Sequence, residues 1–435
     1  MLSPGTSTTE RPQAVATRSS RDHCDKERFE LFDHIIDKGL INPVFQPIVD
    51  ATDHSVVGYE ALARGPHNSV FEAPMELFSV AAQLDRTQEL DQLCQARAIE
   101  SALAAGLGNQ LALFVNLEPS IEQLTVSDRL AAALDAASRH LRLVVEVSER
   151  SIFDHPASLI RMATNIRDRG WGLALDDVGV NPESLALLPF LDPDIVKLDR
   201  SIIADVPTVD TGRTLSAALD HTRRSGALLL AEGIETGYEL ERAMALRAQL
   251  LQGFRFGRGQ ALPPVIPRGV HPFATRRSTF ERSEDTPFDL IEATLPVSIG
   301  RKDLLLAVTH DLERQAESLA DAPILLAVFQ DGFRFGPCTR GRYEAIRDNA
   351  SFVGVLGTGM GNEPARGVRA GNLDQTDPLC DEWTVAVLSP HFAGALIARD
   401  LGDTGPDMQR RFAFAVTHDR EIVIETARIL AARLD

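Results

Sequence analysis

The chain has 435 residues, of which 44% are apolar and 24% charged, and its formal net charge is −18. This length exceeds what one ordinary hydrophobic core supports, so we expect two domains. The acidic balance argues against binding to DNA or RNA duplexes or to anionic membranes, because both need a broad basic surface. The N-terminus has no apolar signal segment, no run is long enough to cross a bilayer, and the four cysteines lack metal-ligand spacing. We therefore expect a cytoplasmic protein with reduced thiols.

Composition changes along the chain indicate where the domains begin and end. Residues 1–26 are rich in Ser, Thr, Pro and Arg, which predicts a flexible tail. Residues 27–265 alternate short apolar runs with longer helical stretches, a pattern typical of parallel βα architecture. Residues 266–287 are rich in Pro, Arg and Ser and predict a linker. Residues 288–435 predict a second, smaller α/β domain that ends in a helix.

The eight apolar runs of the first domain fit either a closed (β/α)8-type barrel or an open doubly wound sheet. Polar residues follow nearly every run, and only a closed barrel brings all strand ends to one rim, so we predict the barrel. The link between the first two runs is too short for a crossover helix, so the first strand should be antiparallel. The predicted strands are 44–49, 56–62, 111–117, 143–147, 172–175, 195–198, 227–231 and 250–254.

The second domain shows its own alternation of elements. An amphipathic helix is predicted over residues 301–319, and a closing helix over 419–434. Between them, apolar runs predict strands at 324–329, 352–356, 383–388 and 393–398. No internal repeat relates the two domains.

The strand ends of the predicted barrel carry an unusual excess of acids. Five carboxylates would share one rim with a single obvious cation, Lys197, and so many negative charges cannot share a dry pocket without a bound cation. Hard oxygen ligands, with Asn116 adding a neutral one, suit Mg²⁺ or Mn²⁺. The adjacent Asp176 and Asp177 could bridge two such ions, which would clamp a phosphoryl group and activate water. The five acids are Glu60, Glu146, Asp176, Asp177 and Glu232.

Seven short stretches in this order resemble the EAL family of cyclic-di-GMP phosphodiesterases. The resemblance covers about residues 28–265 and implies hydrolysis of cyclic di-GMP to linear pGpG with two divalent ions. It also implies that Glu60, Asn116, Glu146 and Asp176 hold one ion. Asp176 and Asp177, with Glu232, would hold the other. The stretches are FQPI (45–48), EALAR (60–64), EVSE (146–149), LDDVG (175–179), KLD (197–199), AEGIE (231–235) and LQG (251–253).

The same resemblance implies roles for the remaining residues. Lys197 would polarise the attacking water, and Glu232 would accept its proton. The substrate contacts would be Gln46, Arg64 and Gln252. Supporting roles near the site would fall to Glu149, Asp199 and Glu235.

One loop departs from the family pattern. Residues 176–185 have the sequence DDVGVNPESL where the family usually has a sequence close to DDFGTGYSSL, and Pro182 removes an amide donor from the turn. In the family this loop couples the metal site to dimerisation, so a homodimer through the barrel is implied. All implied metal ligands are retained, which favours an active enzyme. Two alternatives stay open: a receptor that binds cyclic di-GMP without cutting it, and a protein-interaction scaffold.

The second domain resembles the DICT sensory domain over residues 288–402. The similar stretches are ILLAVFQDGFRF, GRYEAIRDNASFVGVLG and WTVAVLSPHFAGALIARDL. The resemblance does not identify the sensory ligand or partner. Three arginines near aromatic residues (Arg334, Arg340 and Arg342) suggest an anion pocket, although a solvated basic loop also fits them.

Overall fold

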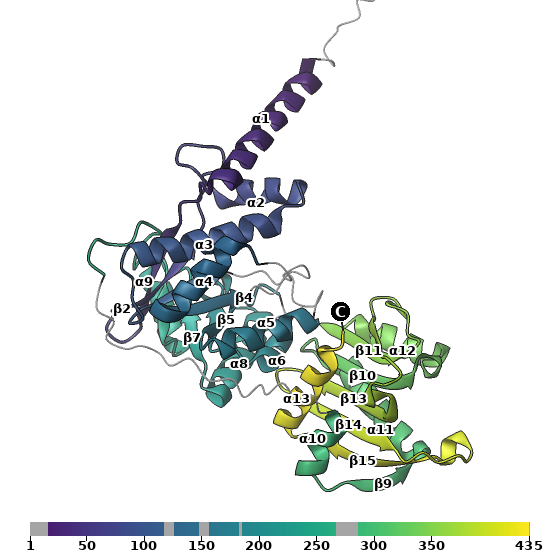
Figure 1. Ribbon diagram of the computed structural model, residues 1–435. Helices are drawn as coiled ribbons and strands as arrows, with labels where there is room; N and C mark the ends of the chain where they lie inside the picture. Colours follow the sequence, from purple (N-terminus) through teal and green to yellow (C-terminus); the bar gives the residue numbers. More distant parts are fainter. Residues whose placement is uncertain (1–15, 117–125, 148–155, 182–184, 267–285, 435) are drawn as a thin grey trace, which may run out of the picture.

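The computed structural model describes residues 16–116, 126–147, 156–181, 185–266 and 286–434. These residues form a closed eight-stranded barrel, followed by a second domain built on a seven-stranded sheet (Figure 1). The predicted fold, an α/β barrel with a smaller α/β domain behind it, is confirmed. Among the helices in those ranges, none combines the length and the apolar character needed to cross a membrane.

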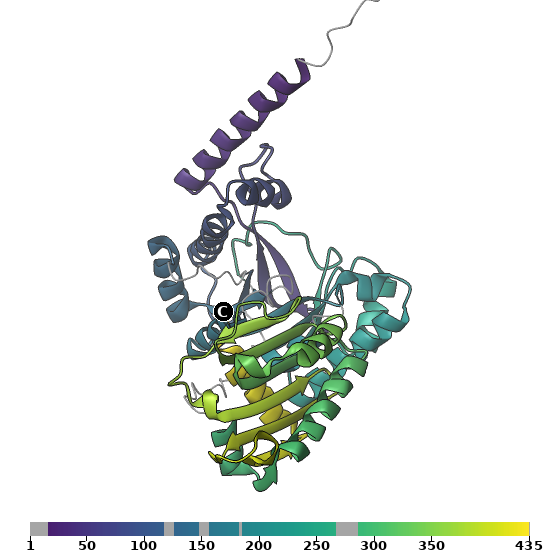
Figure 2. The same cartoon turned by 90° about the vertical axis from the view of Figure 1, so that its right-hand side faces the viewer.

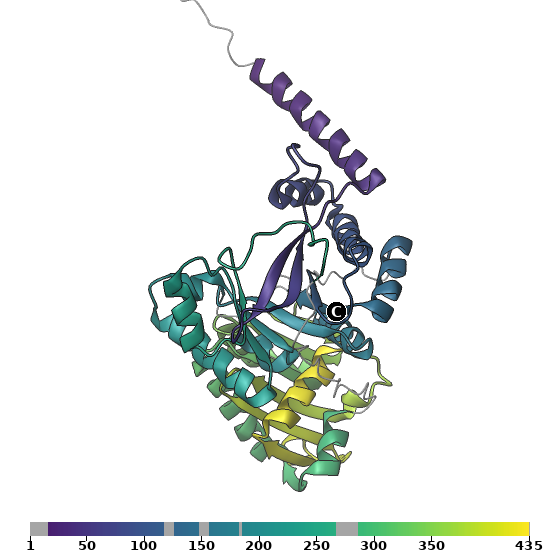
Figure 3. The ribbon, with the colours of Figure 1, turned by 90° about the vertical axis from the view of Figure 1, so that its left-hand side faces the viewer.

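The barrel closes through an antiparallel first strand, as the short link after it predicts. β1 pairs antiparallel with both β2 and β8, and the other neighbouring strands run parallel (Figure 3, purple hairpin). The turn between β1 and β2 is stabilised by the side chains of Asp50 and Asp53, which accept hydrogen bonds from the backbone N–H groups of Thr52 and Ser55. The strands are β1 (Val44–Asp50), β2 (Val56–Leu62), β3 (Ala112–Asn116), β4 (Arg142–Val147), β5 (Gly172–Val178), β6 (Ile195–Leu198), β7 (Leu228–Ala231) and β8 (Leu250–Gln252).

Side chains alternate along the strands between the barrel interior and the surrounding helices. On β4, for example, Val144 belongs to the interior cluster, whereas its neighbours Leu143 and Val145 belong to the apolar core outside the barrel. A residue two positions beyond an interior residue therefore also faces the interior, one step nearer the rim. The interior cluster consists of Ile48, Val57, Ala112, Phe114, Val144, Ala174, Ile195, Leu230 and Leu250.

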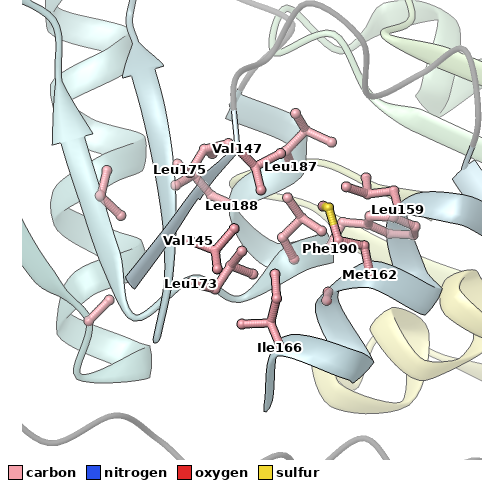
Figure 4. Close-up of a cluster of buried hydrophobic side chains, with 14 of the residues drawn as sticks. Val145, Val147, Leu159, Met162, Ile166, Leu173, Leu175, Leu187, Leu188 and Phe190 are labelled. Atoms are coloured by element: carbon pink, nitrogen blue, oxygen red, sulfur yellow. The ribbon is translucent and has the colours of Figure 1, made fainter. Parts of the chain in front are cut away.

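Helices cover the outside of the barrel, and several begin with clear capping signals. Thr208 and Thr236 each cap a helix through a reciprocal capping box, and Gly226 ends the first of these helices in the left-handed conformation. Figure 4 shows the core between β4, β5 and the two helices α5 and α6. The helices are α2 (Pro74–Gln83), α3 (Thr87–Ala104), α4 (Asp128–His140), α5 (Pro156–Asp168), α6 (Leu187–Leu191), α7 (Arg200–Ala204), α8 (Val209–Ser225) and α9 (Gly237–Ala245).

The N-terminal helix is longer than the sequence predicts. α1 spans Ala16–Lys38 and projects from the barrel (Figure 1), so residues 16–26, which we expected in a flexible tail, are helical. Phe32 and Ile35 are fully buried in a cluster with α2 and α3. Because extending a helix costs much less than starting one, this anchored segment supports further turns on its N-terminal side.

The second domain is a mixed sheet with helices on both faces. The strand order is β12-β11-β10-β13-β14-β15-β9, in which β10, β11 and β12 are parallel and the other pairs antiparallel. Helices α11 and α12 cover the face toward the viewer in Figure 2, and α10 and α13 pack on the other. The elements are α10 (Pro287–Thr294), β9 (Ser298–Arg301), α11 (Lys302–Ser318), β10 (Ile324–Asp331), α12 (Pro337–Arg347), β11 (Phe352–Thr358), β12 (Arg369–Asn372), β13 (Glu382–Leu388), β14 (Ala393–Asp400), β15 (Arg411–Thr417) and α13 (Arg420–Ala431).

The four strands and two helices predicted for this domain are all present. Five further elements, β9, β12, β15, α10 and α12, were not predicted. β9 and β12 are edge strands of four residues each, too short to show an alternating pattern. α10 begins at Pro287, the last residue of the predicted linker, and most of that linker (267–285) lies outside the described residues.

The two domains are in contact through α13, which packs against α5 and α6 of the barrel. The buried Arg428 donates from Nε to the carbonyl oxygen of Phe190 at 2.9 Å, and the amide of Ala157 donates to the carbonyl of Leu434 at 3.2 Å. An entirely apolar crevice lies beside these contacts, between the two helices of the barrel and the second sheet. The yellow helix beside the cluster in Figure 4 is α13.

Candidate active site

Because side chains alternate between the two faces of each strand, the predicted polar residues lie together at one rim of the barrel. On β6, Lys197 follows the interior residue Ile195 by two positions, and on β5 Asp176 follows Ala174 in the same way. The residue directly before each of these polar groups belongs to the surrounding apolar core. The same spacing places Asn116, Glu146, Glu232 and Gln252 beyond the interior residues Phe114, Val144, Leu230 and Leu250.

Lys197 lies at the centre of the rim with its side chain 1% exposed. Its Nζ atom lies 2.5 Å from Glu146 Oε1, 2.8 Å from Glu232 Oε1 and 2.9 Å from Asp176 Oδ1. Glu60 Oε1 is farther away, at 3.8 Å. One ammonium group therefore faces four carboxylates, as the sequence predicts for a rim that is too acidic to balance its own charge.

The acids gather in two groups that share one residue. Oxygen atoms of Glu60, Glu146 and Asp176 lie within 4.8 Å of one another, and so do oxygen atoms of Asp176, Asp177 and Glu232. The role of Asp176 in holding two cations stays a prediction, for which this sharing provides a geometry. Among the described residues, no donor contacts Oε2 of the fully buried Glu146, whereas Glu146 Oε1 and Glu232 Oε1 contact the ammonium group of Lys197.

Burial and crowding perturb the titration of these groups. Burial raises the pKa of Glu232 to about 8 and the pKa of Glu146 well above its usual range. Burial alone would lower the pKa of Lys197, but the surrounding carboxylates, Asp176 first among them, raise it well above the ordinary lysine value. Carboxylates this strongly destabilised in their charged form are the groups that a bound cation would stabilise most.

The loop that begins at Asp176 has a constrained backbone. Asp177 adopts the left-handed conformation (φ +56°), which aspartate tolerates better than most residues, and its amide donates to Asp176 Oδ1 at 2.9 Å. Gly179 has φ +113°, and a Cβ atom there would lie 2.6 Å from the side chain of Ile202. Only glycine fits this position. Pro182, which we expected to alter the turn, lies outside the described residues.

The predicted substrate contacts lie around the same rim. Gln252 Nε2 donates to Glu60 Oε2 at 2.6 Å, and Gln46 Nε2 donates to the carbonyl of Gly257 at 3.2 Å. Gln46 and Glu60 are direct partners in the β1–β2 ladder. Arg64 follows β2 and donates to the carbonyl of Ala63 at 2.7 Å, and its side chain is partly exposed.

The residues expected to support the site have different surroundings. Asp199 accepts a hydrogen bond from the amide of Ser201 at 2.8 Å and so caps α7, and its predicted effect on Lys197 stays a prediction. Glu235 pairs with Arg200, at 3.0 Å between Oε1 and Nη1. Glu149 lies outside the described residues.

One supporting residue was missed at the sequence level. Glu239 is buried, and its Oε2 accepts hydrogen bonds from the amides of Glu235 and Thr236, both at 2.7 Å. It thus holds the segment that follows Glu232 at the end of β7. The pattern Thr236-x-x-Glu239 is a capping box and could have identified this role from the sequence.

Comparison with known proteins identifies similar sequences over both domains. A family model described as "EAL domain" matches residues 30–259, more than half of the chain, and a second, described as "Sensory domain in DIguanylate Cyclases and Two-component system" (DICT), matches residues 290–401. The probable cyclic di-GMP phosphodiesterase PdeG of Escherichia coli (strain K12) is 28% identical over 234 residues, which cover 52% of this chain and 46% of PdeG.

Two further similarities concern the same region. The cyclic di-GMP phosphodiesterase RocR of Pseudomonas aeruginosa is 27% identical over 233 residues, which cover 51% of this chain and 58% of RocR. The chain thus spans about half the length of these curated relatives. A solved EAL domain protein from Listeria monocytogenes is 25% identical with a TM-score of 0.45, covering 54% of this chain and 94% of that one. On the family model's match, the chain belongs to the EAL domain family, and a DICT domain follows its EAL domain.

Proposed function

We propose that this protein hydrolyses cyclic di-GMP to linear pGpG with the help of divalent metal ions. The observation that carries the proposal is the pair of carboxylate groups that share Asp176 at the barrel rim. Two relatives of the same family bear the name cyclic di-GMP phosphodiesterase, one of them as probable. The names of these relatives support cyclic di-GMP as the substrate, and the geometry of the rim supports metal-assisted hydrolysis.

The residues at the rim fit two divalent cations. Glu60, Glu146 and Asp176, with Asn116 at the end of the neighbouring strand, would hold one, and Asp176, Asp177 and Glu232 the other. The donor set is entirely oxygen, which suits Mg²⁺ or Mn²⁺. Oε2 of the buried Glu146, which no donor among the described residues contacts, is available as a ligand. Bound there, such ions would supply charge stabilisation of the phosphoryl group and a more acidic water.

The protein's own groups would position the reactants and move the proton. Lys197 contacts three carboxylates at less than 3 Å, and once bound cations take over such a contact, its ammonium group would orient the attacking water. Glu232, on the partly exposed side of the rim, would accept the proton of this water. Arg64 has a partly exposed guanidinium and would pair with a phosphate oxygen, while Gln46 and Gln252 would bound the nucleotide.

We also propose that the second domain modulates the barrel through its contact with α6. This helix directly follows the loop that carries Asp176 and Asp177, and its Leu187 and Phe190 are buried. Arg428 of α13 binds the backbone of α6 from the other domain. A state that shifts α13 would therefore act on the helix that follows the loop of Asp176 and Asp177 in the sequence. Dimerisation through the barrel, implied by the family, remains a prediction.

A direct test uses the purified full chain. Incubation with cyclic di-GMP and Mg²⁺ or Mn²⁺, followed by chromatographic separation, should give pGpG, and excess EDTA should stop the reaction. Intact cyclic di-GMP after prolonged incubation with either metal would contradict the hydrolase proposal. Such a result, combined with tight nucleotide binding, would identify a receptor. The altered residues Val180 and Asn181, both exposed in the loop after Asp177, are what favour that second candidate.

A further inference from the structure

Three cations of the second domain converge on one carboxylate, Asp407. Lys302 is the first residue of α11, Arg334 follows β10, and Arg410 precedes β15, so three separate elements contribute. Asp407 Oδ1 lies 3.4 Å from Arg334 Nη1 and 3.3 Å from Arg410 Nη1, and Asp407 also pairs with Lys302 Nζ. Arg410 pairs in addition with Asp400. This group of five residues is called the Asp407 cluster below.

The cations of the Asp407 cluster are more buried than the carboxylate that they hold. The side chains of Lys302, Arg334 and Arg410 are 14%, 25% and 14% exposed, whereas that of Asp407 is 58% exposed. A structural ion pair in a core usually buries both partners to a similar degree. Here Asp407 lies on the solvent side of three less exposed cations, which is the direction from which a dissolved anion would arrive.

The charges of the Asp407 cluster do not balance. In the described part of the chain, the ion pairs of these three cations go only to Asp400 and Asp407, so one positive charge is left over. With Asp407 turned out to solvent, two positive charges would remain, matching the charge of a phosphate group. Arg334 also keeps a buried Nε–H that has no acceptor in the structure.

The surroundings of the Asp407 cluster are partly apolar. Phe333, next to Arg334, is 76% exposed, and the Arg334 guanidinium lies 5.3 Å from the centre of its ring. Met408, next to Asp407, is 49% exposed. An exposed aromatic ring beside a group of cations suits a ligand that joins an anionic group to a flat or apolar group.

We propose that the Asp407 cluster is a binding site for the phosphoryl group of a small organic phosphate, and that Asp407 occupies the place of that group until the ligand displaces it. Lys302, Arg334 and Arg410 would bind the phosphate oxygens, and Phe333 would contact the organic part. Arg334 belongs to the basic loop noted in the sequence, whereas Arg342 lies elsewhere and pairs with the buried Glu313 at 2.8 Å. The hydrogen bond from Lys302 lowers the pKa of Asp407, as expected for a carboxylate beside several cations.

Isothermal titration calorimetry of the full chain in EDTA tests this site with two probes, pyrophosphate and adenosine diphosphate. EDTA keeps metal ions out of the barrel, whose acidic rim then repels anions. Arg334→Gln and Lys302→Gln should each weaken pyrophosphate binding by roughly ten- to a hundredfold, the loss of one charge-assisted hydrogen bond. The control Arg366→Gln removes an exposed arginine of the same domain, paired with Asp348, and should leave binding unchanged.

The decisive variant is Asp407→Asn, because it removes the internal competitor. It should tighten pyrophosphate binding roughly tenfold, since a ligand no longer has to displace a charged group. A plain structural ion pair predicts no gain in affinity. Adenosine diphosphate should bind more tightly than pyrophosphate in the wild type, and Phe333→Ala should remove that difference.

The proposal is overturned if neither probe binds to the wild type or Asp407→Asn at millimolar concentration, or if Asp407→Asn binds no more tightly than the wild type. Circular dichroism and the thermal midpoint show whether each variant is folded. If Arg334→Gln fails to fold, Lys302→Gln and Asp407→Asn still decide the matter. None of these outcomes depends on hydrolysis of cyclic di-GMP, so the test is independent of the proposed activity.

Discussion

The ammonium group of Lys197 lies among four carboxylates at the barrel rim, and one of these, Glu146, is wholly buried. Without this ammonium group, the four carboxylates would face one another. The desolvation cost of one such buried charge is several kcal/mol, and a lysine alone cannot offset four of them. The rim is therefore built for additional positive charge. This imbalance, at the scale of single residues, is the physical basis for expecting metal dependence.

Removing Asp176, the proposed shared metal ligand, should abolish turnover. Asp176→Asn keeps the shape of the side chain but removes the charge common to both carboxylate groups, so the rate of pGpG formation should fall by at least roughly a hundredfold. Calorimetric titration with Mn²⁺ should show weaker metal binding in the same variant. Asp135→Asn, an exposed α4 acid paired with Arg139, is the matched control and should retain the wild-type rate. Substantial activity in Asp176→Asn would contradict the metal assignment.

Steady-state kinetics should distinguish residues that act in the chemical step from residues that bind the substrate. Glu232→Gln should lower kcat strongly with little change in KM, because in the proposed mechanism Glu232 acts on water rather than on the nucleotide. Lys197→Met should do the same. Arg64→Ala should instead raise KM roughly tenfold, the cost of one charge-assisted hydrogen bond. If all three variants changed KM alike and left kcat unchanged, this division of roles would be wrong.

At the scale of elements, strands and their ends were predictable because a barrel strand imposes a two-residue period. Once Ile195 faces the interior, Lys197 must face it too, and the same rule places Asp176 and Glu232. The sequence predicted the barrel because polar residues follow nearly every apolar run, and only a closed barrel brings all strand ends to one rim. Distances between groups, such as the 2.5 Å between Lys197 and Glu146, depend on barrel closure and had to come from the structure.

Elements without a two-residue period were harder to predict from the sequence. β9 and β12 have four residues each and lie at sheet edges, so they carry no alternating pattern. The burial of Phe32 and Ile35 was anticipated, but not the extra helical turns from Ala16 that they anchor. The Asp407 cluster joins residues more than a hundred positions apart, and only the fold of the sheet brings them together.

The loop after β5 should be sensitive to any side chain at Gly179. Gly179→Ala combines a left-handed φ of +113° with a Cβ atom 2.6 Å from Ile202, a strain of about 1–3 kcal/mol. Because this strain acts next to Asp177, kcat should fall more than the thermal midpoint. Gly106→Ala, with φ +77° but open space around it, separates the conformational cost from the steric clash. Equal kinetic effects from both variants would argue against a specific role of the loop.

At the scale of the whole molecule, two domains of different architecture share one apolar contact. α13 packs against one face of the second sheet with one side and against α5 and α6 of the barrel with its other side. A single helix therefore belongs to the hydrophobic cores of both domains. Polar contacts also join the two domains. Arg224 Nη2 donates to the carbonyl of Pro390 at 3.2 Å, and Arg213 Nε lies 3.4 Å from Asp321 Oδ1. A helix so placed can transmit a change in the second domain to the barrel without any rigid connecting rod.

This transmission can be tested by separating the domains while keeping both in the chain. Ala431 is 1% exposed and lines the apolar crevice between α13 and the barrel, so Ala431→Glu would bury a charge there unless the domains part. The rate of pGpG formation should then change several-fold with the same metal requirement, and hydrogen exchange at the amides of α6 should become faster. Ala432→Glu, at the exposed neighbouring position, introduces the same charge and should leave both measurements unchanged. Faster exchange in α6 with an unchanged rate would show that the domains dock without regulating catalysis, and the second domain would then be a binding module alone.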